Sequence, residues 1–445
     1  MKLSKLSALL LVLIVPFQIS TVNAQGSGDE VADLRRLVME MQQDYETRIS
    51  DLEERLAQAE RLASGAQDDA DEAVALAEQT AIDQSSGSSA PNVFNPSIGA
   101  VLIGRYADVD RGWDAIPGFQ PAGEIGTGGS GFALGEAEIN LKANVDDRYY
   151  GNLTIGVHDD GDETEVGVEE AWLQTTSLPM GVTVTGGRFF SAAGYLNNFH
   201  FHADDFNDRP LPYQAFFGGR YSVDGLQARW VAPTSLLVEI GTEFNWGSGF
   251  PASPVAESSP GAWTLFSKVG GDVGVSHSWQ AGLSYTSADA VERSGASNDL
   301  FSGDSDLTIA DFVWKWAPRG NTDVRNLKIQ GEYFDRSENG QFANLPYDGS
   351  QDGWYLQGVL QFAPLWRVGI RHDVVDTSNG ALFSGTELED PGRRAYRDSL
   401  MFDWSPSEFS RLRLQYTNDN VLPSSDQQWY LQYIMSIGAH GGHQF

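Results

Sequence analysis

One polar stretch of the sequence carries residues that could bind a metal ion. His200, His202 and Asp204 alternate along the chain, so an extended backbone would present all three side chains on one side. Two imidazoles and a carboxylate suit zinc or another transition metal, and Asp205 and Asp208 stand close enough to assist. The other interpretation is an ordinary polar segment that binds no metal, and the sequence leaves both open.

Other kinds of chemistry find no support in the residue types. The 445 residues include no cysteine, which excludes thiol nucleophiles and iron–sulfur clusters. The sequence has no Gly-Lys-Ser/Thr phosphate loop, no His-Glu-x-x-His and no Gly-x-Ser-x-Gly, so we expect no enzyme and no required cofactor. The formal net charge of −32 argues against nucleic acid as a partner, because phosphate binding needs clustered Lys and Arg.

The elements that must position these residues are short segments with a period of two. Apolar and polar side chains alternate over about ten residues at a time, which is typical of half-buried strands. Sixteen such segments occur: 97–107, 132–145, 149–158, 166–176, 182–192, 224–232, 235–247, 262–270, 275–287, 306–316, 325–336, 353–362, 365–376, 395–405, 408–418 and 427–439.

The connections between these segments alternate in length. Tight turns alternate with long loops at 108–131, 193–223, 288–305 and 377–394, and this pattern with an even strand number is typical of a transmembrane β-barrel. We therefore predict an all-β transmembrane barrel of about 16 antiparallel strands, which would enclose an aqueous channel. A water-soluble array of β-sandwiches is the alternative.

The N-terminal quarter of the chain has a different character. Residues 1–24 have a basic start, an apolar run and a small-residue cleavage site, which indicates a secretory signal peptide rather than a membrane anchor. In 25–83 apolar residues recur at steps of three or four within a charged background, which predicts a periplasmic coiled coil or a solitary helix. Residues 84–92 are a Ser/Gly linker, and 93–445 form the barrel.

Loop 193–223 is the longest connection, and we expect it to narrow the channel. It carries the histidines and aspartates named above together with Arg209. In a ring of sixteen strands it would lie opposite the arginines of the late strands, and the resulting transverse field would orient dipolar solutes. The alternative is local pairing of those arginines with Asp373, Asp403 or Glu332. The residues that we assign to the pore wall are Arg367, Arg371, Arg397, Arg411, Arg413, Glu136 and Glu138.

The order of signal peptide, coiled coil, linker and sixteen-stranded barrel resembles the phosphate-selective porin family. Segments 186–191 and 438–445 are also similar to outer-membrane proteins often labelled as receptors, and the final Phe445 resembles the signal read by the barrel-assembly machinery. The resemblance implies a homotrimer in the outer membrane of a Gram-negative bacterium.

These features predict selective passive diffusion of small hydrophilic solutes or ions through a lipid-embedded barrel. The acidic excess predicts a preference for cations. The alternatives are a zinc-like metal uptake protein or receptor that uses loop 193–223, and an adhesin or tether that needs no open lumen.

Overall fold

The computed structural model describes part of the N-terminal unit and most of the barrel. The described residues are Met39, Gln43, 96–120, 125–159, 164–247, 250–251, 260–295, 297 and 299–438. The chain divides into two units, Met1–Val93 and Phe94–Phe445. Met39 and Gln43 are helical, and the predicted signal peptide, linker and remaining coiled coil lie outside the described residues. None of the helices in the described part of the chain is long and apolar enough to cross a bilayer.

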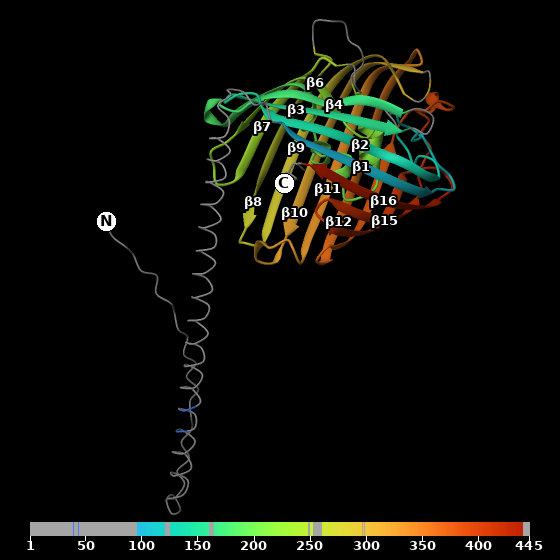
Figure 1. The fold of residues 1–445 in the computed structure, drawn as a ribbon. Helices are drawn as coiled ribbons and strands as arrows, with labels where there is room; N and C mark the ends of the chain where they lie inside the picture. The colour runs from blue at the N-terminus through green and yellow to red at the C-terminus, as the bar shows by residue number, and fades with distance from the viewer. Residues whose placement is uncertain are drawn as a thin grey trace, which may run out of the picture. The chain divides into compact units, whose positions relative to one another are not determined.

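The second unit is a closed barrel of sixteen antiparallel strands, which confirms the predicted fold (Figure 1). Each strand pairs with its neighbours in sequence, and β1 pairs with β16 to close the ring. The strands are β1 Ser97–Asp108, β2 Gly131–Asn144, β3 Tyr149–Asp159, β4 Thr164–Thr175, β5 Val182–Phe190, β6 Ser222–Val231, β7 Leu237–Asn245, β8 Ala262–Val273, β9 His277–Ser294, β10 Leu300–Trp316, β11 Asn326–Phe342, β12 Leu345–Ala363, β13 Trp366–Thr377, β14 Ala395–Ser407, β15 Ser410–Asp419 and β16 Asp426–Gly438.

The two faces of the barrel wall follow the alternation of the sequence. On β15, Leu412 and Leu414 are exposed on the outer face, whereas Arg413 and Gln415 are fully buried on the inner face. On β16, Leu431 is exposed beside the buried Gln432. Apolar side chains therefore cover the outside of the ring, and polar and charged ones line the inside.

Strands β9 to β12 are longer than predicted, and the expected loop at 288–305 is mostly strand. β9 continues to Ser294 and β10 begins at Leu300. On β11 the outward side chains change from Tyr333 to Asp335 and Ser337. The backbone hydrogen bonds between the strands continue there, although the outward side chains are polar. The alternation of apolar and polar residues therefore does not reveal this part of the strand.

The connection from β5 to β6, residues 191–221, turns into the barrel and is called the inward loop below. It contains three short helices: η2 Leu196–Asn198, η3 Phe201–Ala203 and α2 Leu211–Phe217. Every residue of α2 is buried, although the helix lies in a connecting segment. The loop is packed against the wall, where α2 contacts β12 and β13.

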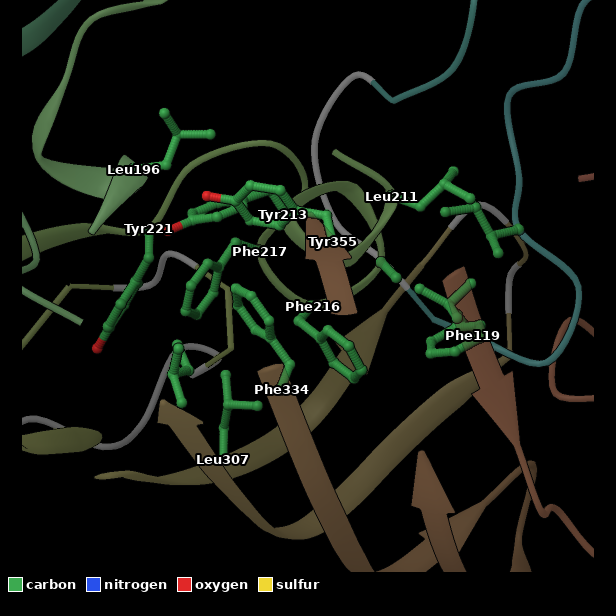
Figure 2. Close-up of a cluster of buried hydrophobic side chains, with 14 of the residues drawn as sticks. Phe119, Leu196, Leu211, Tyr213, Phe216, Phe217, Tyr221, Leu307, Phe334 and Tyr355 are labelled. Carbon is green, nitrogen blue, oxygen red and sulfur yellow. The ribbon is translucent and has the colours of Figure 1, made fainter. Parts of the chain in front are cut away.

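Aromatic side chains hold the inward loop against the wall (Figure 2). Phe216 of α2 is stacked on Phe334 of β11, with ring centroids 5.6 Å apart and an interplanar angle of 5°. Phe119, from the connection between β1 and β2, meets Phe216 edge to face at 5.6 Å. This apolar cluster occupies part of the lumen at the level of the inward loop and narrows it there, as the sequence predicts for this loop.

Candidate functional site

One buried carboxylate of the wall, Glu332, anchors two parts of the inward loop. Glu332 of β11 accepts hydrogen bonds from the backbone N–H groups of Tyr195 and Leu196, at 2.9 and 3.0 Å. The hydroxyls of Tyr213 and Tyr355 donate to the same carboxylate, at 2.9 and 2.5 Å. These four hydrogen bonds hold the start of the loop and α2 at one point of the wall.

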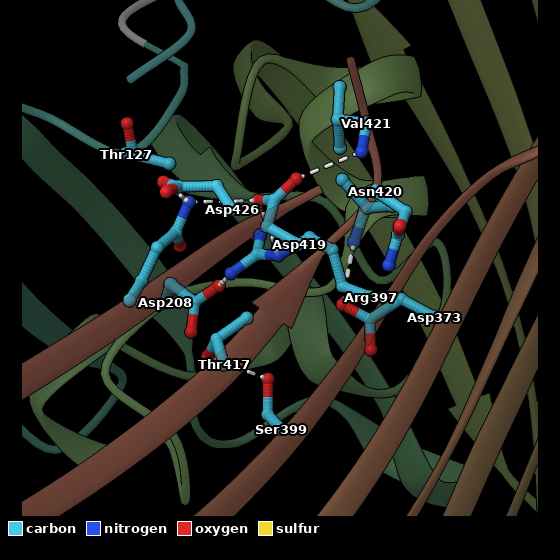
Figure 3. Close-up of polar contacts among 12 residues, drawn as sticks. Thr127, Asp208, Asp373, Arg397, Ser399, Thr417, Asp419, Asn420, Val421 and Asp426 are labelled. Atoms are coloured by element: carbon cyan, nitrogen blue, oxygen red, sulfur yellow. Dashed lines mark hydrogen bonds and ion pairs between the residues drawn. The ribbon is translucent and has the colours of Figure 1, made fainter. Parts of the chain in front are cut away.

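Asp208, which lies between η3 and α2, joins the inward loop to β13 and β14 (Figure 3). Its carboxylate pairs with Arg371 of β13 at 3.0 Å and with Arg397 of β14, and it accepts a hydrogen bond from the Gln415 amide at 2.7 Å. Arg371 also donates to the Asp208 carbonyl at 2.7 Å. The loop therefore reaches across the lumen and contacts the arginines of β13 and β14, which are called the arginine wall below.

Asp205 makes a second crossing of the same kind. It pairs with Lys328 of β11 and with Arg367 of β13, the latter at 3.1 Å. The Gln357 amide donates to it at 3.0 Å. Burial alone would raise the pKa of Asp205, but Lys328 and Arg367 outweigh that effect and hold the pKa well below its usual value. The same balance, with Arg371 and Arg397 as partners, lowers the pKa of Asp208, so both groups stay charged.

The arginines pair with wall carboxylates as well as with the loop. Asp403 of β14 pairs with Arg367 and, at 2.9 Å, with Arg413. Arg411 approaches the same group at 3.8 Å, and Arg413 also donates to the Asp204 carbonyl at 2.7 Å. The sequence predicts a transverse electric field between the loop and the arginines across the lumen. In the structure the loop lies against the arginines, so these charges form direct contacts instead.

A second charged cluster lies where the loop meets β2 and β4. The Nδ1 atoms of His200 and His202 lie 3.1 and 3.3 Å from one Glu138 oxygen. The Nε2 atom of His200 lies 3.0 Å from Glu170, and its Nδ1 is 3.4 Å from Glu169. Burial would lower the pKa of His200, but the surrounding glutamates outweigh it and raise that pKa well above its usual value.

The predicted metal ligands are brought together only in part. The rings of His200 and His202 are stacked with centroids 5.6 Å apart, whereas Asp204 pairs with Arg209 at 2.6 Å. The turn of 3-10 helix at Phe201–Ala203 breaks the alternation that would have placed Asp204 beside the histidines. Glu138, predicted as a wall residue, takes its place.

Glu169, Glu170 and Arg220 belong to this cluster and were not predicted. Thr154 of β3 pairs with Glu170 and Ile155 pairs with Val168, so Glu169 is an extra residue at a bulge. A bulge breaks strict alternation, which brings two consecutive glutamates to the histidine. Arg220 pairs with Glu169 at 3.0 Å. The pair Glu169-Glu170 was the available signal, but strict alternation would place one of the two outside.

Two cavities border the inward loop on the side of the short turns. One, of about 400 Å³, is lined by Tyr195 and Phe199 of the loop and by Arg229, Glu239 and Lys268 of the wall. The other, of about 570 Å³, is lined by Asp205 and by a basic group, Lys315, Lys328 and Arg367. Both are large enough for small solutes and are lined by charged side chains.

Comparison with solved structures supports the architecture. The chain is similar to a loop-deletion mutant of OmpT, an outer membrane protein of Vibrio cholerae, with a TM-score of 0.50 and 13% identity over 77% of this chain and 99% of that one. The outer membrane channel DcaP of Acinetobacter baumannii also has a TM-score of 0.50 and 13% identity, over 77% of this chain and 97% of that one. At this identity the likeness shows the fold alone.

Sequence comparison identifies a relative. No family model matches the chain. An uncharacterized protein of Aquifex aeolicus is 30% identical over 341 residues, which are 71% of this chain and 70% of the relative. The chain therefore belongs to the same protein family as this Aquifex aeolicus protein.

Proposed function

We propose that the protein is an outer-membrane channel for passive diffusion of small hydrophilic solutes. The observation that carries the proposal is a closed sixteen-stranded ring that is apolar outside and charged inside. Such a ring satisfies its backbone hydrogen bonds in lipid, and its inner face suits water and polar solutes rather than lipid. Neighbouring folds include a protein described as an outer membrane channel.

The inward loop makes the proposed channel narrow. It is tied to β11 through Glu332 and to β13 and β14 through Asp205 and Asp208. Solutes would therefore pass through the charged spaces beside the loop rather than through a wide central tube. Wide, non-specific diffusion is not expected from a lumen narrowed in this way.

Cation preference is supported by the distribution of unneutralised charge. The loop aspartates lie against arginines, whereas the cluster at β2 and β4 sets Glu136, Glu138, Glu169 and Glu170 against Arg220. These four acidic side chains outnumber the basic partners Arg220 and His200 that the cluster places beside them. This surplus attracts cations, with screening by salt over a Debye length of about 8–10 Å.

The assembled form that we propose is a homotrimer in the outer membrane of a Gram-negative bacterium. The apolar stripe within 25–83 needs partner helices, and three copies in the periplasm would supply them. The barrel-assembly machinery would insert the barrel through its last strand.

Single-channel recording in a planar bilayer tests the proposal. With the purified mature protein under a KCl gradient, we expect discrete conductance steps and a reversal potential on the cation-selective side. A folded barrel, identified by its heat-modifiable mobility in gels, that gives no steps would refute the channel. Steps with an anion-directed potential would refute the cation preference alone.

A further inference from the structure

We infer that Glu138, His200 and His202 form a binding site for a divalent transition metal ion such as zinc. The inference rests on the proposed function, because the ion would reach this site through the lumen of the proposed channel. It differs from the site that the sequence predicted, because Asp204 is committed to Arg209 and the carboxylate comes from β2.

The spacing of the three ligand atoms suits a tetrahedral ion. Zinc binds imidazole nitrogen and carboxylate oxygen at about 2.0–2.2 Å, which places neighbouring ligands about 3.3 Å apart. The Glu138 oxygen lies 3.1 Å from His200 Nδ1 and 3.3 Å from His202 Nδ1. All three ligand atoms lie within 4.8 Å of one another, so small side-chain rotations would complete the site.

The carboxylate at the centre of the site has unused binding capacity. Glu138 is 4% exposed, and its second oxygen has no hydrogen-bond partner among the described residues. A buried carboxylate oxygen without a partner is costly. An ion held between Glu138 and the two histidines would bring positive charge to this position.

His200 is oriented as metal-binding histidines commonly are. Its Nε2 atom faces Glu170 at 3.0 Å, which leaves Nδ1 for the metal and fixes the ring. Carboxylates in this place behind a ligating histidine orient it and raise its basicity. Glu170 is itself held, since Trp172 and Asn152 donate to it at 3.0 and 3.1 Å.

The backbone around the site is specialised on both strands. β2 has a register shift against β1 between Leu102 and Gly104, next to Glu136, and β4 has the bulge at Glu169. Bulges commonly occur beside functional sites because they redirect side chains. Here they aim carboxylates from two strands at the same pair of histidines.

An ion can approach the cluster from the side of the long loops. A cavity of about 270 Å³ is lined by Glu169 and Arg220, together with Arg188 and Asp224. Glu169 lies 3.4 Å from His200 Nδ1, the same ring atom that faces Glu138. The cavity with its charged lining therefore lies next to the proposed site.

Metal titration of the full chain in detergent tests the inference. After treatment with a chelator, zinc binding is measured by calorimetry, and cobalt is used as a probe whose visible absorption reports tetrahedral coordination. We expect one ion per chain. The double variant His200→Ala/His202→Ala and the isosteric Glu138→Gln should bind at least about 100-fold more weakly, and Glu170→Gln about 10–100-fold more weakly.

The control is His440→Ala/His443→Ala, which removes two histidines elsewhere in the sequence and should leave binding unchanged. The inference is overturned if the wild type binds no zinc, or if binding follows His440 and His443. Conductance recorded on the same preparation separates the two proposals. A conducting barrel without zinc binding refutes only the metal site, and a zinc-binding barrel without conductance refutes the channel.

Discussion

Neutralising Asp208 should release the inward loop from the arginine wall. The substitution Asp208→Asn keeps the shape of the side chain and removes the charge that faces Arg371 and Arg397. Breaking one side of a buried ion pair typically costs about 3–5 kcal/mol. We take the lower end, about 3 kcal/mol, because Arg371 retains Asp373 at 2.7 Å and Arg397 retains Asp419 at 3.4 Å.

The absence of native cysteine makes the release directly measurable. Ala215 of α2 is 0% exposed, so a cysteine placed there reacts with a maleimide only when the loop opens. If labelling follows the population of the open loop, a loss of about 3 kcal/mol raises its rate on the order of 100-fold. The background substitution Ala215→Cys is present in both proteins and cancels in the ratio.

Asp224→Asn is the matched control for this experiment. Asp224 pairs with Arg188 at 2.6 Å, but their side chains are 40% and 44% exposed. Exposed pairs contribute about 0–1 kcal/mol, so labelling should rise by no more than about 5-fold. Equal rates for Asp208→Asn and its parent, or equal rates for the two variants, would refute the role assigned to Asp208.

Three further predictions concern packing, backbone and pH. Phe334→Ala removes a fully buried ring that is stacked on Phe216 of α2. This loss should weaken the closed state of the inward loop by about 3–5 kcal/mol and speed labelling of the cysteine at position 215. An unchanged labelling rate would contradict a role for Phe334 in holding the loop. Gly187→Ala should impair barrel folding, because φ of Gly187 is +124° and an added Cβ would lie 2.2 Å from a carbonyl oxygen of β4. The control is Gly167→Ala, whose added Cβ meets nothing within 4 Å and which should fold. Heat-modifiable gel mobility distinguishes the two variants, and a normally folded Gly187→Ala barrel would contradict the prediction. The pKa of Asp208 is lowered in the folded protein, so the stabilisation that Asp208 provides is complete above its unfolded pKa of about 4 and is lost only as pH falls below that value. The near-ultraviolet circular dichroism that reports the packing of the inward loop should therefore be constant from pH 7 to 5. A change in that range attributable to Asp208 would contradict the charged state assigned to it.

The barrel could be predicted from the sequence because lipid imposes a strict pattern. Leu412 and Leu414 face outward and Arg413 faces inward, as their alternation predicts. The pattern fails at Asp335 and Ser337 of β11, whose outward-facing side chains are polar. There the hydrogen-bond ladder persists, but nothing selects apolar side chains.

The candidate site was predictable in part. His200 and His202 do lie together, but Asp204 would join them only in an extended loop. A 3-10 turn separates Asp204 from them. The bulge that brings in Glu169 is a property of strand pairing, which no local sequence pattern specifies.

The most direct test of the central claim is osmotic swelling of liposomes that contain the purified protein. With neutral solutes of increasing size, a channel narrowed by the inward loop should admit the smallest solutes and show a steep decline as size increases. No swelling with any solute, from a barrel whose folding is confirmed by heat-modifiable mobility, would contradict the account. Equal rates for small and large solutes would contradict the narrowing of the lumen by the loop.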